Sequence, residues 1–159
     1  MNSNRSIKLV MVALASAALL FAGCAQQKKS VSAEPAKPAQ KVETVKSVSK
    51  PSTNSVYFAF DSAELDASAQ ATLDGYAAWL NANRNADIKI EGNCDQRGSR
   101  EYNLALGQER ADSVKNYLSA RGVSSSRVDT VSFGEERPVC NGTGEACWAQ
   151  NRHADIVAR

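Results

Sequence analysis

The hydrophobic pattern changes twice along the chain, near residue 23 and near residue 54, and so defines three stretches. Residues 9–23 form an apolar run without a charged residue, and residues 25–54 contain no aromatic residue, Leu or Ile. Residues 55–159 alternate short apolar runs with polar turns. Only this last stretch has the periodicities that predict packed helices and strands, so we expect one folded domain over residues 55–159.

Four strands and two helices are predicted in this domain. Alternating or β-branched runs predict strands over residues 55–60, 88–92, 129–133 and 154–158. Apolar residues recur at helical spacing from Leu65 to Leu80, and Asp66 or Ser68 can cap this first helix. The same spacing recurs over residues 100–120, and Gly122 then supplies a C-terminal stop for the second helix. The order βαβαββ predicts an α+β two-layer sandwich: a four-stranded mixed sheet with both helices on one face.

Gly107 lies inside the second predicted helix, where glycine costs about 1 kcal/mol relative to alanine. We therefore expect residues 102–106 to form a separate turn and Gly107 to be the N-cap of the main helix. Arg110 would then lie in the first turn, where a cation opposes the helix dipole. A cation placed against this local preference suggests that Arg110 serves a binding partner.

The N-terminal stretch is typical of an export signal. Arg5 and Lys8 precede the apolar run, which is shorter than the roughly 20 residues needed to span a bilayer. The sequence Leu-Phe-Ala-Gly-Cys at residues 20–24 resembles a bacterial lipoprotein box, which implies a signal peptide over residues 1–23 and a lipid on Cys24. Ala25 after this cysteine favours the outer membrane. The alternative is an ordinary signal peptide followed by an incidental cysteine.

Residues 24–54 are interpreted as a tether. Three Pro and six Lys among many Ser and Ala cannot bury enough apolar area to form a core, so disorder is expected. Residues 1–50 hold eight Lys or Arg and two Glu, whereas residues 51–159 hold eleven Lys or Arg and fifteen Asp or Glu. The formal net charge of +2 excludes a protein that covers nucleic acid with positive charge.

The folded stretch carries a long motif. The run from Ile90 to Ala111 (IEGNCDQRGSREYNLALGQERA), with Phe60-Asp61, Gly134-Glu135 and Pro138, and Asn151-Arg152, resembles the OmpA-like peptidoglycan-binding domains. With its lipoprotein box and tether, the whole chain resembles the lipid-anchored members of that family. It departs from the family pattern at two positions. Asn93 stands where the family often has His, and His153 stands where it usually has a second Arg.

The resemblance implies a site for diaminopimelate, which carries an ammonium and a carboxylate on one carbon. Asp95 would accept from the ammonium, and Arg110 would fork to the carboxylate with two hydrogen bonds. The resemblance also assigns contacts to other residues of the site: Phe60, Asp61, Leu106 and Arg152. Arg97 and Arg100 are expected to be solvated loop charges without a ligand role. The alternative for Asp95 and Arg110 is an ordinary salt bridge within the domain.

The implied function is that of an outer-membrane lipoprotein facing the periplasm, which binds peptidoglycan without catalysis. It would link the outer membrane to the cell wall with the Tol system, through a TolB-like partner, and support envelope integrity and cell division. One alternative is a lipoprotein of the same domain type outside the Tol system. Another is an exported cell-wall hydrolase, which would need Asp61 and Asp95 as paired carboxylates. We expect no cofactor, because no nucleophile or metal-ligand pattern accompanies those carboxylates.

The cysteines are expected to have three roles. Export permits disulfides, and Cys24 is committed to lipid if the lipoprotein box is functional. Cys140 and Cys147 lie inside a 17-residue predicted loop, residues 134–150, which is long for a segment without structure. A Cys140–Cys147 bridge would staple this loop and leave Cys94 free and buried. The chain has one histidine, His153, and no Cys-x-x-Cys, so a zinc site is not expected.

Overall fold

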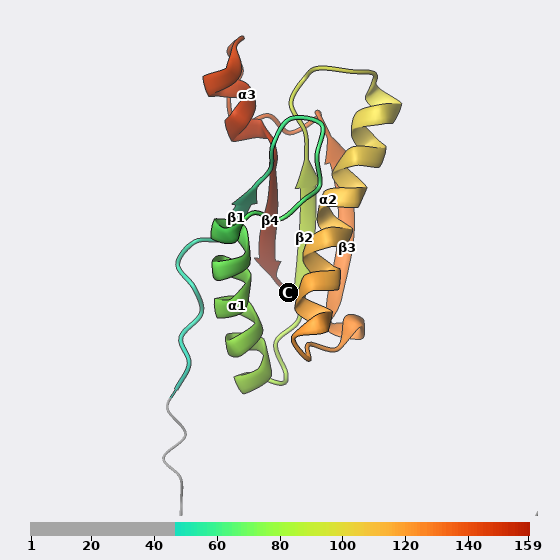
Figure 1. Cartoon of the computed structure of the whole chain (residues 1–159). Coiled ribbons are helices and arrows are strands. Elements are labelled where there is room, and N and C mark those ends of the chain that lie inside the picture. Colours follow the sequence, from blue (N-terminus) through green and yellow to red (C-terminus); the bar gives the residue numbers. More distant parts are fainter. Residues whose placement is uncertain (1–46) are drawn as a thin grey trace, which may run out of the picture. The chain divides into compact units, whose positions relative to one another are not determined.

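A four-stranded mixed sheet with two helices on one face forms the domain (Figure 1). The computed structural model describes residues 47–159, so the signal peptide, Cys24 and residues 24–46 of the tether lie outside the described residues. The elements are β1 (Ser55–Tyr57), α1 (Ala67–Ala82), β2 (Ile88–Asn93), α2 (Arg100–Ala120), η1 (Ser125–Arg127), β3 (Val128–Gly134), α3 (Glu145–Asn151) and β4 (His153–Ala158).

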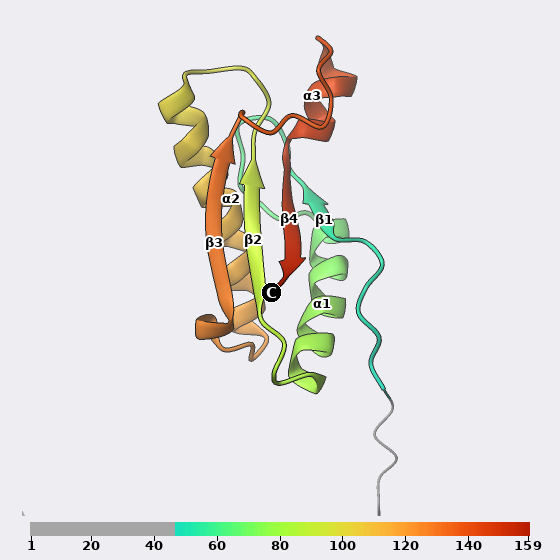
Figure 2. The same cartoon turned by 180° about the vertical axis from the view of Figure 1, so that it is seen from behind.

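The strand order in the sheet is β1-β4-β2-β3. β2 runs parallel to β3 and antiparallel to β4, and β1 pairs antiparallel with the other edge of β4. α1 and α2 cover one face, and the view from behind shows the strands in front of both helices (Figure 2). The predicted βαβαββ order, mixed sheet and placement of the helices are thereby confirmed.

Local sequence explains where the two long helices begin. The Asp66 side chain caps α1 by accepting from the backbone N–H of Ala69 at 2.7 Å. The Ser99 hydroxyl caps α2 by accepting from the N–H of Tyr102 at 3.2 Å. Both helices bury an apolar stripe against the sheet, and these side chains form one core: Leu73, Tyr76 and Leu80 of α1, Val114 and Leu118 of α2, and Ile88, Ile90, Val128 and Ile156 of the strands.

Two predicted segments differ from the structure. The first strand ends at Tyr57 and not at residue 60. The Phe58 N–H still donates to the Arg152 carbonyl at 2.9 Å, but the chain then leaves the sheet and forms a long connection to α1. The helix α3 begins within the predicted loop over residues 134–150. Its seven residues are too few to show a helical period in the sequence. The turn η1 was not predicted either.

The expected break at Gly107 is wrong, because α2 is continuous from Arg100 to Ala120. Gly107 lies where the helix presses against the sheet. A Cβ built on Gly92 of β2 would lie 1.8 Å from the Gly107 carbonyl oxygen, and one built on Gly107 would lie 2.3 Å from Ser132 Oγ. Arg110 is therefore in the helix interior, and the argument from the helix dipole does not apply to it.

Candidate functional site

A cavity of about 390 Å³ lies between the β1–α1 connection, the β2–α2 connection and the first half of α2. Its lining contains five of the six side chains assigned to the ligand from sequence: Phe60, Asp61, Asp95, Leu106 and Arg110. The sixth, Arg152, lies behind it and contacts Asp95. In Figure 1 these two connections meet at the end of the sheet that also carries α3.

Arg110 is the most deeply buried charged group of the site, with no exposed surface. Its Nε donates to the Ser62 carbonyl at 2.9 Å, Nη1 to the Asn93 carbonyl at 2.8 Å, and Nη2 to the Ala59 carbonyl at 3.1 Å. Nη1 also lies 3.4 Å from Cys94 Sγ. Burial lowers the pKa of Arg110 below its usual value. No carboxylate among residues 47–159 lies within ion-pair distance of this guanidinium.

Asp95 is also buried, but its charge is paired. Arg97 donates to it through Nε at 2.9 Å, Nη2 at 2.6 Å and the backbone N–H at 3.0 Å, and Arg152 Nη1 lies 3.3 Å from Oδ2. Burial alone would raise the pKa of the Asp95 carboxyl, but the hydrogen bonds from the two arginines outweigh it and hold this pKa below its usual value. The ordinary salt bridge between Asp95 and Arg110 does not occur among the described residues.

Arg97 is not the solvated loop charge that we expected. Its guanidinium lies 3.9 Å from the centre of the Phe60 ring and 4.3 Å from that of Trp148, and it pairs with Asp95. The guanidinium therefore lies against two aromatic rings, one from the β1–α1 connection and one from α3, and contributes to the cavity wall. Sequence spacing could not reveal this, because Phe60 and Trp148 are brought to it only by the tertiary fold.

The β1–α1 connection is shaped for this site. Asp61 has a positive φ of 54°, which is uncommon outside glycine and is typical of functional sites. The Tyr102 hydroxyl, from the first turn of α2, donates to the Asp61 carboxylate. Phe60 beside it is more than half exposed at the cavity rim. Tyr102 lines the cavity but was not predicted as a site residue, because an exposed tyrosine in a first helical turn gives no signal on its own.

The two departures from the family pattern contact each other. Asn93 Nδ2 lies 3.1 Å from His153 Nε2, and both side chains are buried. Asn93 also supplies a carbonyl to Arg110, and His153 follows Arg152 directly. His153 Nδ1 lies 2.9 Å from the Gln150 carbonyl and therefore donates to it. Nε2 also lies 3.4 Å from Asp155 Oδ2, and the contacts of Asn93 and His153 help to fix the backbone behind the cavity.

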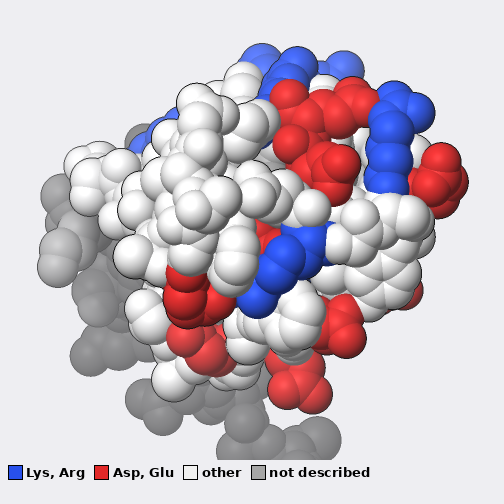
Figure 3. Space-filling view, turned by 90° about the horizontal axis from the view of Figure 1, so that it is seen from above, with Lys and Arg blue, Asp and Glu red and all other residues white. Residues whose placement is uncertain are grey.

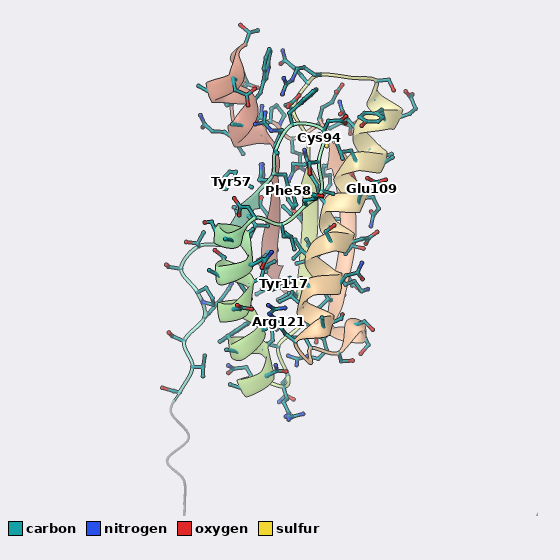
Figure 4. The ribbon with its side chains drawn as sticks, in the orientation of Figure 1. Tyr57, Phe58, Cys94, Glu109, Tyr117 and Arg121 are labelled. Atoms are coloured by element: carbon teal, nitrogen blue, oxygen red, sulfur yellow. A yellow bond between two sulfur atoms is a disulfide. The ribbon has the colours of Figure 1, made fainter. Side chains whose placement is uncertain are left out.

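The three cysteines among the described residues have the arrangement expected from sequence, whereas Cys24 lies outside these residues. A disulfide joins Cys140 to Cys147 and ties the β3–α3 connection to α3. Cys94 is free and buried. Figure 4 places Cys94 beyond the end of β2, near the β2–α2 connection, and Phe58 in the connection that follows β1. Arg110 lies between them, because its guanidinium carbon is 5.2 Å from the Phe58 ring centre.

The charges around the site balance each other. Asp61, Asp95, Arg97 and Arg110 all line the cavity, and Glu145 pairs with Arg152 at 2.6 Å. On the face seen from above in Figure 3, acidic and basic side chains are interspersed. A zwitterion fits such a site better than a polyanion does. Within residues 47–159, no group of His, Cys, Asp and Glu could hold a metal ion, and no helix is long and apolar enough for a membrane span.

Comparisons with known proteins indicate the family of this chain. The sequence profile of the OmpA family matches residues 57–152. The peptidoglycan-associated lipoprotein of Pasteurella multocida is 49% identical over 104 residues, which cover 65% of this chain and 69% of the relative. The peptidoglycan-associated lipoprotein of Rhizobium meliloti is 41% identical over 156 residues, which cover 93% of this chain and 86% of the relative.

Among solved structures, the crystal structure of the peptidoglycan-associated lipoprotein from Burkholderia pseudomallei superposes with a TM-score of 0.66. Its sequence is 48% identical, and the match covers 67% of this chain and 91% of that structure. The fold, the site and these similarities lead to one assignment. The chain belongs to the OmpA family, in the group of the peptidoglycan-associated lipoproteins.

Proposed function

We propose that this chain binds peptidoglycan non-covalently, through the diaminopimelate of the stem peptide, and does not cleave it. The ligand's ammonium goes to Asp95 and its carboxylate to Arg110. Phe60, Asp61 and Leu106 form the wall of the cavity, and Arg152 holds Asp95 from behind. Relatives named peptidoglycan-associated lipoproteins support this proposal, and the OmpA family profile matches residues 57–152, which contain all the residues of the site.

The observation that carries the proposal is the unpaired charge of Arg110. A buried cation without an anionic partner is costly, and proteins retain one where a ligand completes it. Among the described residues, four of the five guanidinium N–H groups of Arg110 have an acceptor. Three of these acceptors are backbone carbonyls, and the fourth is the sulfur of Cys94. One Nη2 N–H remains for a ligand carboxylate. The N–H that now contacts the Cys94 thiol can also turn to the ligand, and a carboxylate that accepts from both N–H groups would form a strong charge-assisted interaction with Arg110.

A hydrolase is not favoured by the same geometry. Asp61 accepts from the Tyr102 hydroxyl, and Asp95 is ion-paired to two arginines, so both carboxylates are already engaged by donors of the protein itself. The protein is therefore a binding protein and not an enzyme.

The test is co-sedimentation of the full chain with purified sacculi. Arg110→Ala would leave several carbonyls without a donor, so the informative variants are Arg110→Lys and Asp95→Asn, which keep most of the volume. Losing a charge-assisted partner costs about 1.5–3 kcal/mol, so each variant should bind roughly 10- to 100-fold more weakly. The matched controls are Arg121→Lys and Asp74→Asn, an exposed ion pair between α1 and the residue that follows α2. Circular dichroism checks folding; site variants that fold and sediment like the controls would refute the proposal.

We further propose how the site is delivered to the cell wall. Residues 1–23 are a signal peptide, residues 24–54 a lipidated Cys24 and its tether, and residues 55–159 the binding domain. The lipid holds the chain in the outer membrane with its domain in the periplasm, and the chain supports envelope integrity and cell division. The similarity to lipoproteins over 93% of the chain supports this arrangement.

A Tol-system protein of the TolB type is the proposed protein partner. Mild crosslinking followed by co-purification would recover it, whereas a lipoprotein outside the Tol system would recover none of these proteins.

A further inference from the structure

The carboxylate of Asp95 has no free acceptor position in this structure. Oδ1 accepts from the backbone N–H and Nε of Arg97, and Oδ2 accepts from Arg97 Nη2 and Arg152 Nη1. An ionised carboxylate offers about four lone-pair sites, so these four bonds fill it. A ligand ammonium can reach Asp95 only if one of these donors leaves.

Arg97 is the donor that can leave. Its side chain is 29% exposed, whereas that of Arg152 is 6% exposed. Arg152 is also fixed by the Phe58 carbonyl at 3.0 Å and by Glu145 at 2.6 Å. The other contacts of the Arg97 side chain are the two aromatic rings and, at 3.6 Å, Glu145. A cation that leaves these contacts can form new ones with water or with a ligand.

We propose that Arg97 is a specificity-determining residue, which occupies the ammonium subsite and yields it only to a ligand that also carries a carboxylate beside its ammonium. This inference rests on the proposed function and concerns the choice between ligands at that site. A lone amine, such as a lysine side chain, would break the Arg97–Asp95 pair and form one ammonium–Asp95 pair in its place, so it would gain little binding free energy. Its binding would also lose the geometry of the bidentate fork that Arg97 now makes.

An amino-acid head group differs because its carboxylate adds interactions that Arg97 cannot supply for itself. The carboxylate can accept from the remaining N–H of Arg110. The displaced Arg97 can pair with the same carboxylate, because its backbone is fixed beside the cavity by the N–H bond to Asp95. The exchange then ends with more ion pairs than it began with. Arg97 therefore selects diaminopimelate over lysine at the same position of a stem peptide, because only diaminopimelate has this second carboxylate.

The experiment measures discrimination and not affinity alone. The full chain is titrated by calorimetry with two tripeptides, L-Ala-γ-D-Glu-meso-diaminopimelate and L-Ala-γ-D-Glu-L-Lys. The variants are Arg97→Met, which keeps an unbranched side chain between the rings without its charge, and Arg97→Ala. Arg100→Ala is the control, because Arg100 is an exposed neighbour that pairs with Glu136 away from the cavity.

Wild type should prefer the diaminopimelate peptide by about tenfold or more, the effect of one charge-assisted contact. In both Arg97 variants the lysine peptide should bind about five- to tenfold more tightly, since its ammonium no longer competes with a guanidinium. The preference should shrink by about the same factor. Trp148 fluorescence should change on ligand binding in wild type and much less in Arg97→Met, because only wild type moves a guanidinium off that ring.

Two failures can be told apart. If wild type binds neither peptide, the proposed function is wrong. If wild type prefers the diaminopimelate peptide and the folded Arg97 variants keep that preference unchanged, the function stands and the role of Arg97 is overturned.

Discussion

Cys94 shows how the site controls the chemistry of a single residue. Its thiol donates to the Asn103 carbonyl at 3.3 Å and lies 3.4 Å from Arg110 Nη1. Burial raises the pKa of the Cys94 thiol to about 11, although the positive charge of Arg110 offsets part of this rise. The thiol therefore stays protonated and unreactive in the folded chain at neutral pH.

This pKa predicts a pH dependence of stability. In the unfolded chain the thiol loses its proton near pH 8.5, whereas the folded chain holds it until about pH 11. The unfolded state therefore binds fewer protons in that window, and the free energy of unfolding falls as the pH rises, by at most about 1.4 kcal/mol per pH unit. Urea unfolding at pH 8, 9 and 10 should give a steeper decline for wild type than for Cys94→Ala. Parallel declines would contradict the shifted pKa.

At the scale of elements, the contact between α2 and β2 holds Arg110 in place. Gly92 in β2 and Gly107 in α2 face each other without side chains, so the helix approaches the sheet closely. Gly107 lies one turn before Arg110, whose guanidinium is thereby brought within reach of three carbonyls from two other segments. The cost of a glycine within a helix is offset here by the close approach it permits.

We predict that Gly92→Ala destabilises the domain and weakens peptidoglycan binding. The new Cβ would lie 1.8 Å from the Gly107 carbonyl oxygen, a backbone atom that cannot rotate away, so α2 must shift. Overpacking of this kind costs about 1–3 kcal/mol in unfolding free energy, measured by urea denaturation. Gly142→Ala is the control, because its Cβ would be 3.5 Å from Cys147 Sγ, an ordinary contact. Equal stability of the two variants would show that the α2–β2 contact is not tight.

The same contact shows what the sequence could and could not predict. Periodicity located α1, α2 and β2 within a few residues, because each buries a regular stripe such as Leu73, Tyr76 and Leu80. It misjudged Gly107, since the main reason for that glycine lies in β3, where Ser132 Oγ would be 2.3 Å from an added Cβ. Resemblance to a family is the basis for proposing Asp95 and Arg110 as ligand contacts. The contacts of Arg97 depend on two aromatic rings from distant segments, which no local pattern encodes.

At the scale of the whole molecule, the site lies at one end of the domain and the chain enters along the side of α1. Lys50 Nζ lies 5.9 Å from the Trp79 ring centre, near the C-terminal end of α1. The chain then passes Gly75, near Pro51, on its way to β1. The described residues that precede β1 therefore lead away from the cavity (Figure 1). We therefore expect the proposed anchor and the proposed binding site to act independently.

This arrangement makes anchoring and binding separable, which is our last prediction. Cys24→Ser removes the proposed lipidation site and should release the chain from the membrane fraction. Cys24 is not part of the domain over residues 55–159, so the released protein should bind sacculi as wild type does. The measurement is membrane fractionation at high salt, followed by co-sedimentation with sacculi. Gln26→Ser, a neighbouring substitution that leaves Cys24 intact, should stay with the membrane. A Cys24→Ser chain that resists high salt would mean that the apolar run of residues 9–23 anchors the protein instead.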